Sequence, residues 1–200
     1  MLQRFLEWLG TLTPHDEEHG TVDVHHVRGF RVLVENSRPD IATNDVLERL
    51  GEALDVIGLY QPWRLRHLER DLHQFRIVRF PCRGAYFPGE RTCITELTFL
   101  ARRDITAATV ASSILHEGIH ARVDCMGVSR EHRDRAREER LCRRAELEFG
   151  RSLPADLGRP VVDRAISTIE LADEEVAPSI DWEEATARQR AVDNAARKES

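Results

Sequence analysis

The residues with the clearest chemical potential are His116, Glu117 and His120, in the run His-Glu-Gly-Ile-His. On an α-helix, residues four apart lie on one face, so the two imidazoles can bind one metal ion. Glu117 is displaced from His116 by about 100° around the helix axis, because a helix has about 3.6 residues per turn. Its carboxylate can therefore lie beside the metal and reach a water molecule there. The H-E-x-x-H spacing thus predicts a site for one Zn²⁺ ion, with Glu117 as the catalytic carboxylate.

A catalytic zinc ion takes three protein ligands and keeps one position open, so a third donor is required. The helix expected next in the chain offers Glu138, Glu139 and Glu146. Glu139, Cys142, Glu146 and Phe149 are separated by steps of three and four residues, so they share one helix face. We expect this face to pack on the helix of the histidines. The spacing leaves the three glutamates open as ligands, and for Glu139 an ordinary ion pair with Arg135 or Arg143 is the competing interpretation.

The two motifs together resemble those of the gluzincin metallopeptidases, in which a glutamate follows H-E-x-x-H after eighteen residues. Eighteen residues also separate His120 from Glu139, and the run 116–124 is similar to the thermolysin form H-E-x-x-H-A-x-x-D. The resemblance implies that Glu139 is the third ligand and that Asp124 is a carboxylate that steadies an imidazole. It covers about residues 75–150, and it extends to small bacterial proteins of unknown role with a minimal gluzincin core.

A second point of resemblance lies upstream, at Gly84, Ala85 and Tyr86. In gluzincins an edge strand at this place binds an extended peptide by main-chain hydrogen bonds, as in β-augmentation. Gly84 would permit a close approach of the backbone, although an ordinary hairpin edge is the alternative interpretation. Large gluzincin peptidases also use a tyrosine or histidine to stabilise the oxyanion, and Tyr86 and His132 are the candidates for that role in this sequence.

Apolar periodicity and turn residues predict the elements that must position these side chains. A long helix over 105–125 carries the histidines and ends near Gly127, where a C-terminal glycine cap is expected. A second helix runs from a cap at Ser129 to about Phe149. Upstream and downstream of this pair, we expect the following elements: strands at 21–26, 30–34, 75–80, 84–87 and 91–100, and helices at 44–58, 62–73, 161–171 and 183–197.

This order of elements indicates an α+β protein. With the resemblance, it implies a zincin-like fold with a small N-terminal mixed sheet and an edge strand. An active-site helix, a glutamate helix and a helical C-terminal extension follow. We expect residues 1–155 to form a zincin-like metallopeptidase domain and residues 156–200 to form a charged helical extension.

The composition narrows the classes of partner. The formal net charge is −6, whereas nucleic-acid binders carry a basic surplus, so no nucleic-acid partner is expected. No stretch approaches the roughly 20 apolar residues of a membrane span, and Glu7 interrupts the apolar start of the chain, so we expect a cytoplasmic protein without a membrane anchor. The four cysteines form no C-x-x-C pair and are expected to be free thiols, unless secretion allows a bridge between Cys82 and Cys93.

Three functions are compatible with these residues. The first is a zinc-dependent hydrolase of peptide bonds, acting on a peptide or protein substrate. The second is a zinc-containing peptide-binding or regulatory module without turnover. The third is a metal-free helical interaction protein in which the histidine spacing is accidental. We favour the hydrolase, with Glu117 as the base that takes a proton from water.

Overall fold

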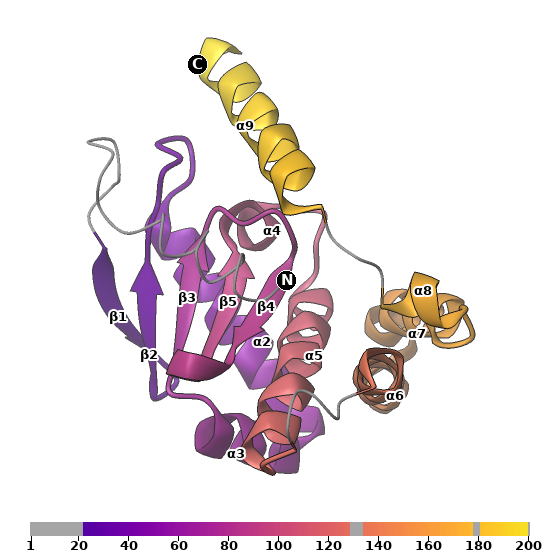
Figure 1. Cartoon of the computed structure of the whole chain (residues 1–200). Coiled ribbons are helices and arrows are strands. Elements are labelled where there is room, and N and C mark those ends of the chain that lie inside the picture. Colours follow the sequence, from indigo (N-terminus) through magenta and orange to yellow (C-terminus); the bar gives the residue numbers. More distant parts are fainter. Residues whose placement is uncertain (1–21, 129–133, 178–180, 200) are drawn as a thin grey trace.

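The computed structural model describes residues 22–128, 134–177 and 181–199. It confirms the expected α+β class: residues 23–96 form a five-stranded mixed sheet with two helices between its second and third strands, and the rest is mostly helical (Figure 1). The strands are arranged in the order β1-β2-β3-β5-β4. Their bounds are β1 (Asp23–Val27), β2 (Phe30–Val34), β3 (Gln74–Val78), β4 (Gly84–Phe87) and β5 (Thr92–Glu96). The three central strands β2, β3 and β5 run parallel, and β1 and β4 pair antiparallel with their neighbours at the two edges.

One face of the sheet is covered by α2 (Thr43–Tyr60), which follows β2 in the chain (Figure 1). The apolar residues of α2 recur at helical spacing, and Val46, Leu50 and Ile57 are fully buried. They belong to one core cluster with Phe75 and other residues of the sheet. Each such side chain stabilises the fold by about 1.5–3 kcal/mol when it is removed from water. The helix α3 (Pro62–Asp71) begins at the predicted proline.

The helix of the histidines, α5 (Ala107–Cys125), lies beside β4 at the edge of the sheet (Figure 1). Thr106 caps its first turn by accepting a hydrogen bond from the backbone N–H of Thr109. Gly127 has a φ of +74° and follows the C-cap residue Met126, which is where a glycine cap is expected. A Cβ atom on Gly118 would collide with the buried Leu68 of α3. The glycine between the two histidines therefore allows α3 to pack closely on α5.

The predicted strand 91–100 is too long. The strand β5 ends at Glu96, and Leu97–Ala101 form the short helix α4. The reason is local: the Glu96 carboxylate accepts hydrogen bonds from the backbone N–H of Phe99 at 2.6 Å and from the Thr98 hydroxyl at 2.6 Å. This N-cap outweighs the β-propensity of the threonine and phenylalanine side chains.

The glutamate helix, α6 (Arg135–Ser152), packs on α5 and on α7 (Ala155–Ile169), as Figure 1 shows. Its first turn is capped by Asp134, whose side chain accepts from the Arg137 N–H at 3.0 Å. The predicted cap at Ser129 lies outside the described residues. The helix continues to Ser152, beyond its expected end near Phe149. The helix predicted at 161–171 begins earlier, at Ala155, and therefore includes Pro160.

The residues of the predicted C-terminal extension, 156–200, contain most of α7 together with α8 (Asp173–Val176) and α9 (Trp182–Glu199), so their described part is largely helical. The helix α9 contacts the rest of the described structure: Trp182 packs on Phe80, and Asp193 pairs with Arg79 and Arg38. A cavity of about 440 Å³ lies between α9 and the sheet, and neither histidine of α5 lines it. Among the helices of the described ranges, none combines the length and the apolar character that crossing a bilayer requires.

Candidate metal centre

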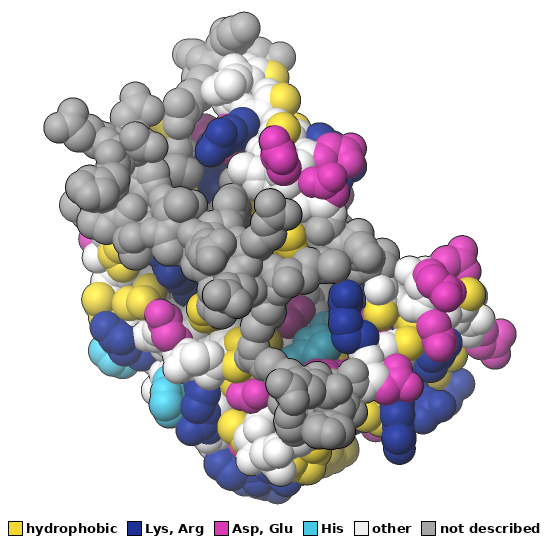
Figure 2. Space-filling model, in the orientation of Figure 1, with side chains coloured by type: hydrophobic (Ala, Val, Ile, Leu, Met, Phe, Trp, Pro, Cys, Tyr) yellow, Lys and Arg dark blue, Asp and Glu magenta, His cyan; other side chains and the backbone are white. Residues whose placement is uncertain are grey.

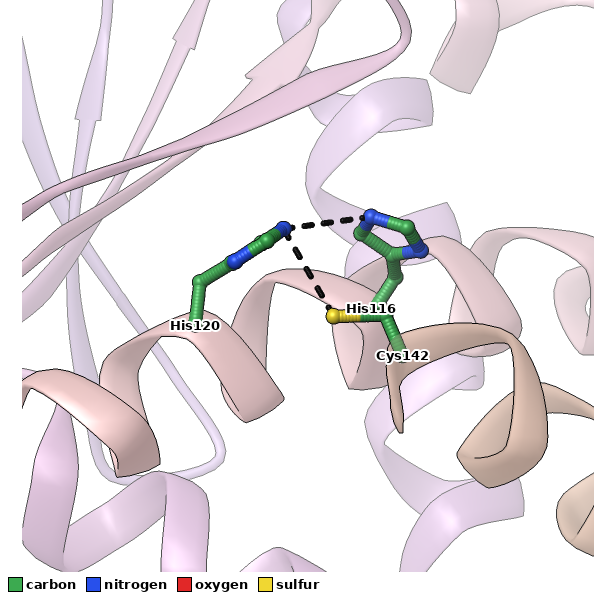
Figure 3. A group of neighbouring side chains, drawn as sticks. All are labelled: His116, His120 and Cys142. Carbon is green, nitrogen blue, oxygen red and sulfur yellow. Dashed lines mark hydrogen bonds between the residues drawn. The ribbon is translucent and has the colours of Figure 1, made fainter. Parts of the chain in front are cut away.

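The two histidines of α5 point into the same space. The Nε2 atoms of His116 and His120 are 3.3 Å apart, and the rings meet edge to face (Figure 3). His116 is buried, with 8% of its surface exposed, and His120 is half-buried. Buried imidazoles need polar partners, and the partners of these two come from the neighbouring helix α6.

The Nδ1 atom of each imidazole contacts a carboxylate of α6. Glu146 Oε1 lies 2.6 Å from His116 Nδ1, and Glu138 Oε1 lies 2.7 Å from His120 Nδ1. An ionised carboxylate only accepts hydrogen bonds, so each Nδ1 carries the proton. In the neutral imidazoles the free lone pairs are then on the two Nε2 atoms, which face one another. Carboxylate, histidine and metal are commonly arranged in this way, because the carboxylate fixes the tautomer and orients the ring.

Glu139 is the glutamate of α6 that lies beside both Nε2 atoms. Its two carboxylate oxygens are 3.2 Å from His116 Nε2 and 3.5 Å from His120 Nε2. Glu138 and Glu146, the alternative ligands, instead contact the Nδ1 atoms on the outer sides of the rings. The structure thus brings all three glutamates to the histidines and gives them different positions. Glu139 has the position that a third ligand would need.

Cys142 is the donor that sequence reasoning did not name as a ligand. Its Sγ atom lies 3.6 Å from His120 Nε2 and within 4.8 Å of the ligand atom of His116, and the side chain is fully buried (Figure 3). The structure therefore contains a buried group, His116, His120 and Cys142, that could hold a metal ion. The available signal was the spacing of three between Glu139 and Cys142, which puts both on the helix face that meets α5.

Two of these separations, both measured from His120 Nε2, match those between ligands of one tetrahedral zinc ion. Two nitrogen ligands about 2.0–2.1 Å from a tetrahedral zinc are about 3.3–3.4 Å apart, and a nitrogen and a sulfur ligand are about 3.5–3.6 Å apart. The observed values are 3.3 Å between the two Nε2 atoms and 3.6 Å between His120 Nε2 and Cys142 Sγ. Imidazole, carboxylate and thiolate are also the donor types that zinc takes in proteins.

The electrostatics of the cluster also suit a cation. Burial lowers the pKa of His116, but the negative charges of Cys142, Glu139 and Glu146 outweigh burial and raise this pKa to about 10. The pKa of His120 is raised well above its usual range, against the effect of burial, by Cys142 and the glutamates. Burial raises the pKa of Glu139, but the two imidazoles lower it well below its usual range. The side chains thus stabilise positive charge at the point where the donors meet.

Glu117 leaves α5 in a different direction and lies against β4. A Cβ atom on Gly84 would be 3.5 Å from Glu117 Cγ and 3.6 Å from its Oε1. Only 8% of Glu117 is exposed. The catalytic candidate therefore lies against the edge strand. A Cβ atom at position 84 would be in van der Waals contact with it and only 3.0 Å from the Ile94 carbonyl oxygen.

Two further candidate site residues, Tyr86 of β4 and Asp124 of α5, contact each other. The Tyr86 hydroxyl lies 3.1 Å from Asp124 Oδ2 and donates to it, and burial together with the charge of Asp124 raises the pKa of Tyr86. Asp124 was expected to steady an imidazole, but the Nδ1 atoms of both imidazoles contact glutamates of α6. Ala85 packs on the small apolar cluster of Phe80 and Ile94. His132, the other candidate for the oxyanion, lies outside the described residues.

The molecular surface is hollowed near the metal centre. Figure 2 shows histidine surface in a hollow between the positions of α5 and α6, bordered by acidic and basic side chains.

Comparison of the chain with models of known protein families, with curated proteins and with solved structures found no match. The function must therefore be argued from the residues of the site itself.

Proposed function

We propose that this chain is a zinc-dependent hydrolase of peptide bonds. The observation that carries the proposal is the convergence of three donors, His116 Nε2, His120 Nε2 and the Glu139 carboxylate. Glu117, the neighbour of His116 on α5, lies close to Gly84 of β4. Zinc held by such donors would supply Lewis-acid chemistry, because it polarises a carbonyl group and lowers the pKa of water. The buried group of histidines and cysteine supports metal binding in general, and the choice of zinc rests on the donor types and their separations.

Glu117 is the residue that we assign to proton transfer. It follows His116 directly, so it emerges from the same turn of α5 at a different angle. In this role it takes a proton from water as water attacks the scissile carbonyl, and it then delivers the proton to the leaving amine. Its position between α5 and Gly84 limits the number of conformations of the carboxylate. General acid–base catalysis of this kind contributes a factor of about 10²–10⁴ to the rate.

We assign substrate binding to the edge strand β4. The Arg83 carbonyl accepts a hydrogen bond from the Glu96 N–H at 3.0 Å, so Arg83 faces β5. Because the direction of main-chain groups alternates along an antiparallel pair, the N–H and C=O groups of Gly84 and Tyr86 point away from β5. An extended peptide could pair with these groups by β-augmentation and pass Glu117. An antiparallel edge strand beside the histidine helix, followed by the glutamate helix, is also the basis for proposing a zincin-like fold.

The test combines zinc content with turnover. We expect near-stoichiometric zinc by elemental analysis in the wild type and in Glu117→Gln, and a marked loss of zinc in Glu139→Ala. In a diverse peptide library, cleavage by the wild type should fall by about 10²-fold or more in Glu117→Gln. Cleavage retained by this variant would exclude Glu117 as the base, and a wild type that takes up no zinc even after reconstitution would end the proposal.

A zinc-containing peptide-binding or regulatory module without turnover is the second candidate, and a specific observation favours it. Cys142 Sγ stands beside the donor cluster, so it can fill the position that a catalytic zinc ion leaves open. The Tyr86 hydroxyl, one of the two oxyanion candidates, already donates to Asp124. A fully zinc-loaded protein that binds peptides but cleaves none of them would support this function, and robust cleavage would exclude it.

A further inference from the structure

The position of Cys142 decides whether the metal centre is open or closed. Cys142 lies one turn after Glu139 on α6, and its side chain points toward the histidines (Figure 3). It is fully buried, and its Sγ contacts His120 Nε2 at 3.6 Å. This separation suits a thiol–imidazole hydrogen bond in the metal-free protein, and it also suits two ligands of one metal ion.

A tetrahedral ion held by His116, His120 and Glu139 has one position left. The Cys142 sulfur is at the distance from His120 Nε2 that two ligands of one zinc ion show, which is about 3.5–3.6 Å for nitrogen and sulfur. It also lies within 4.8 Å of the ligand atom of His116. Thiolate is a softer and stronger donor for zinc than water. The sulfur should therefore occupy that position whenever metal is bound.

We propose that Cys142 is a fourth protein ligand that closes the metal centre in the resting protein, so that turnover requires its sulfur to leave the metal. The requirement for turnover rests on the proposed hydrolase function, whereas ligation of the metal by Cys142 does not depend on any activity. The smallest movement that releases the position is a rotation about the Cα–Cβ bond of Cys142, which carries Sγ to another staggered position. The histidines and Glu139 keep their places in that movement.

Ligation is tested on the whole protein loaded with cobalt(II) in place of zinc. A cobalt ion bound to a thiolate has an intense sulfur-to-metal charge-transfer absorption in the near ultraviolet. We expect this band in the wild type and in Cys93→Ser, and its loss in Cys142→Ser. Cys93 is the matched control, because it is equally buried but lies on β5, outside the metal-binding group. A cobalt-loaded wild type without the band would overturn the proposal, and this result needs no variant.

Closure is tested by zinc affinity and by cleavage in the same set of proteins. Cys142→Ser and Cys142→Ala should bind zinc at least about tenfold more weakly than the wild type, since loss of an outer-shell partner alone costs that much. At saturating zinc, both should cleave peptides faster than the wild type. A charge-transfer band without this increase, in a wild type that does cleave, would refute closure. A band without cleavage in any variant would refute the hydrolase function and leave ligation by Cys142 standing.

Discussion

The prediction that tests the architecture of the centre most directly is Glu146→Gln. Glu146 is 3% exposed, and its Oε1 accepts from His116 Nδ1 at 2.6 Å and from Arg143 at 2.8 Å. The amide keeps the size of the side chain but removes the charge that makes the imidazole a better metal ligand. Loss of such an outer-shell partner typically weakens metal binding about 10–100-fold, which corresponds to about 1.4–2.7 kcal/mol.

The assay is a competition titration of zinc between the protein and a chromophoric chelator of known affinity. The matched control is Glu148→Gln, the same chemical change on the same helix. Glu148 pairs with Arg64 at 2.7 Å, and its side chain is 65% exposed, so this variant should bind zinc as the wild type does. An affinity of Glu146→Gln within twofold of the control would refute the reasoning, because the Nδ1 contact would then not orient a ligand.

Two further predictions concern stability. Gly158→Ala should destabilise the fold by about 1–3 kcal/mol or more, because the new Cβ atom would collide with the Gly150 carbonyl oxygen where α7 meets α6. The control is Gly89→Ala, in which nothing lies within 4 Å of the new atom, so its urea midpoint should equal that of the wild type. Equal midpoints would show that the two helices do not pack as described. In the metal-free protein, the pKa of His116 is raised from 6.5 to about 10, so its contribution to stability is present below pH 6.5 and is lost as the pH rises through 10. Urea midpoints of chelator-treated protein should therefore fall between pH 6.5 and 10. Zinc affinity should instead rise with pH, because the ligands must lose protons to bind the metal. Midpoints that rise over this pH range would contradict the raised pKa of His116.

Much of the fold was predictable because the relevant signals are local. Apolar periodicity and turn residues marked β1 and β2, and the helical spacing of apolar residues marked α2. The hairpin of β4 and β5 was also confirmed. The errors arose where a single side chain overrode propensity, as Glu96 did when its carboxylate capped α4 and ended β5.

The parallel pairing of β3 with β2 and with β5 depended on tertiary contacts. Strand order is decided by which apolar faces cover one another, and residues far apart in the chain make those contacts. A zincin-like relationship stays a proposal for the same reason, since it concerns the arrangement of elements in space and only short motifs point to it.

By itself, the sequence determined that His116 and His120 would share a helix face, and that Glu139, Cys142 and Glu146 would share another. Helical periodicity requires both, whatever the rest of the chain does. Only the tertiary structure decided what each acidic or thiol group does there. The rotation of α6 against α5 places Glu146 and Glu138 at the Nδ1 atoms, and Glu139 and Cys142 beside Nε2. Spacing within one helix defines a face, but the packing of two helices selects which atom of one side chain meets which atom of the other.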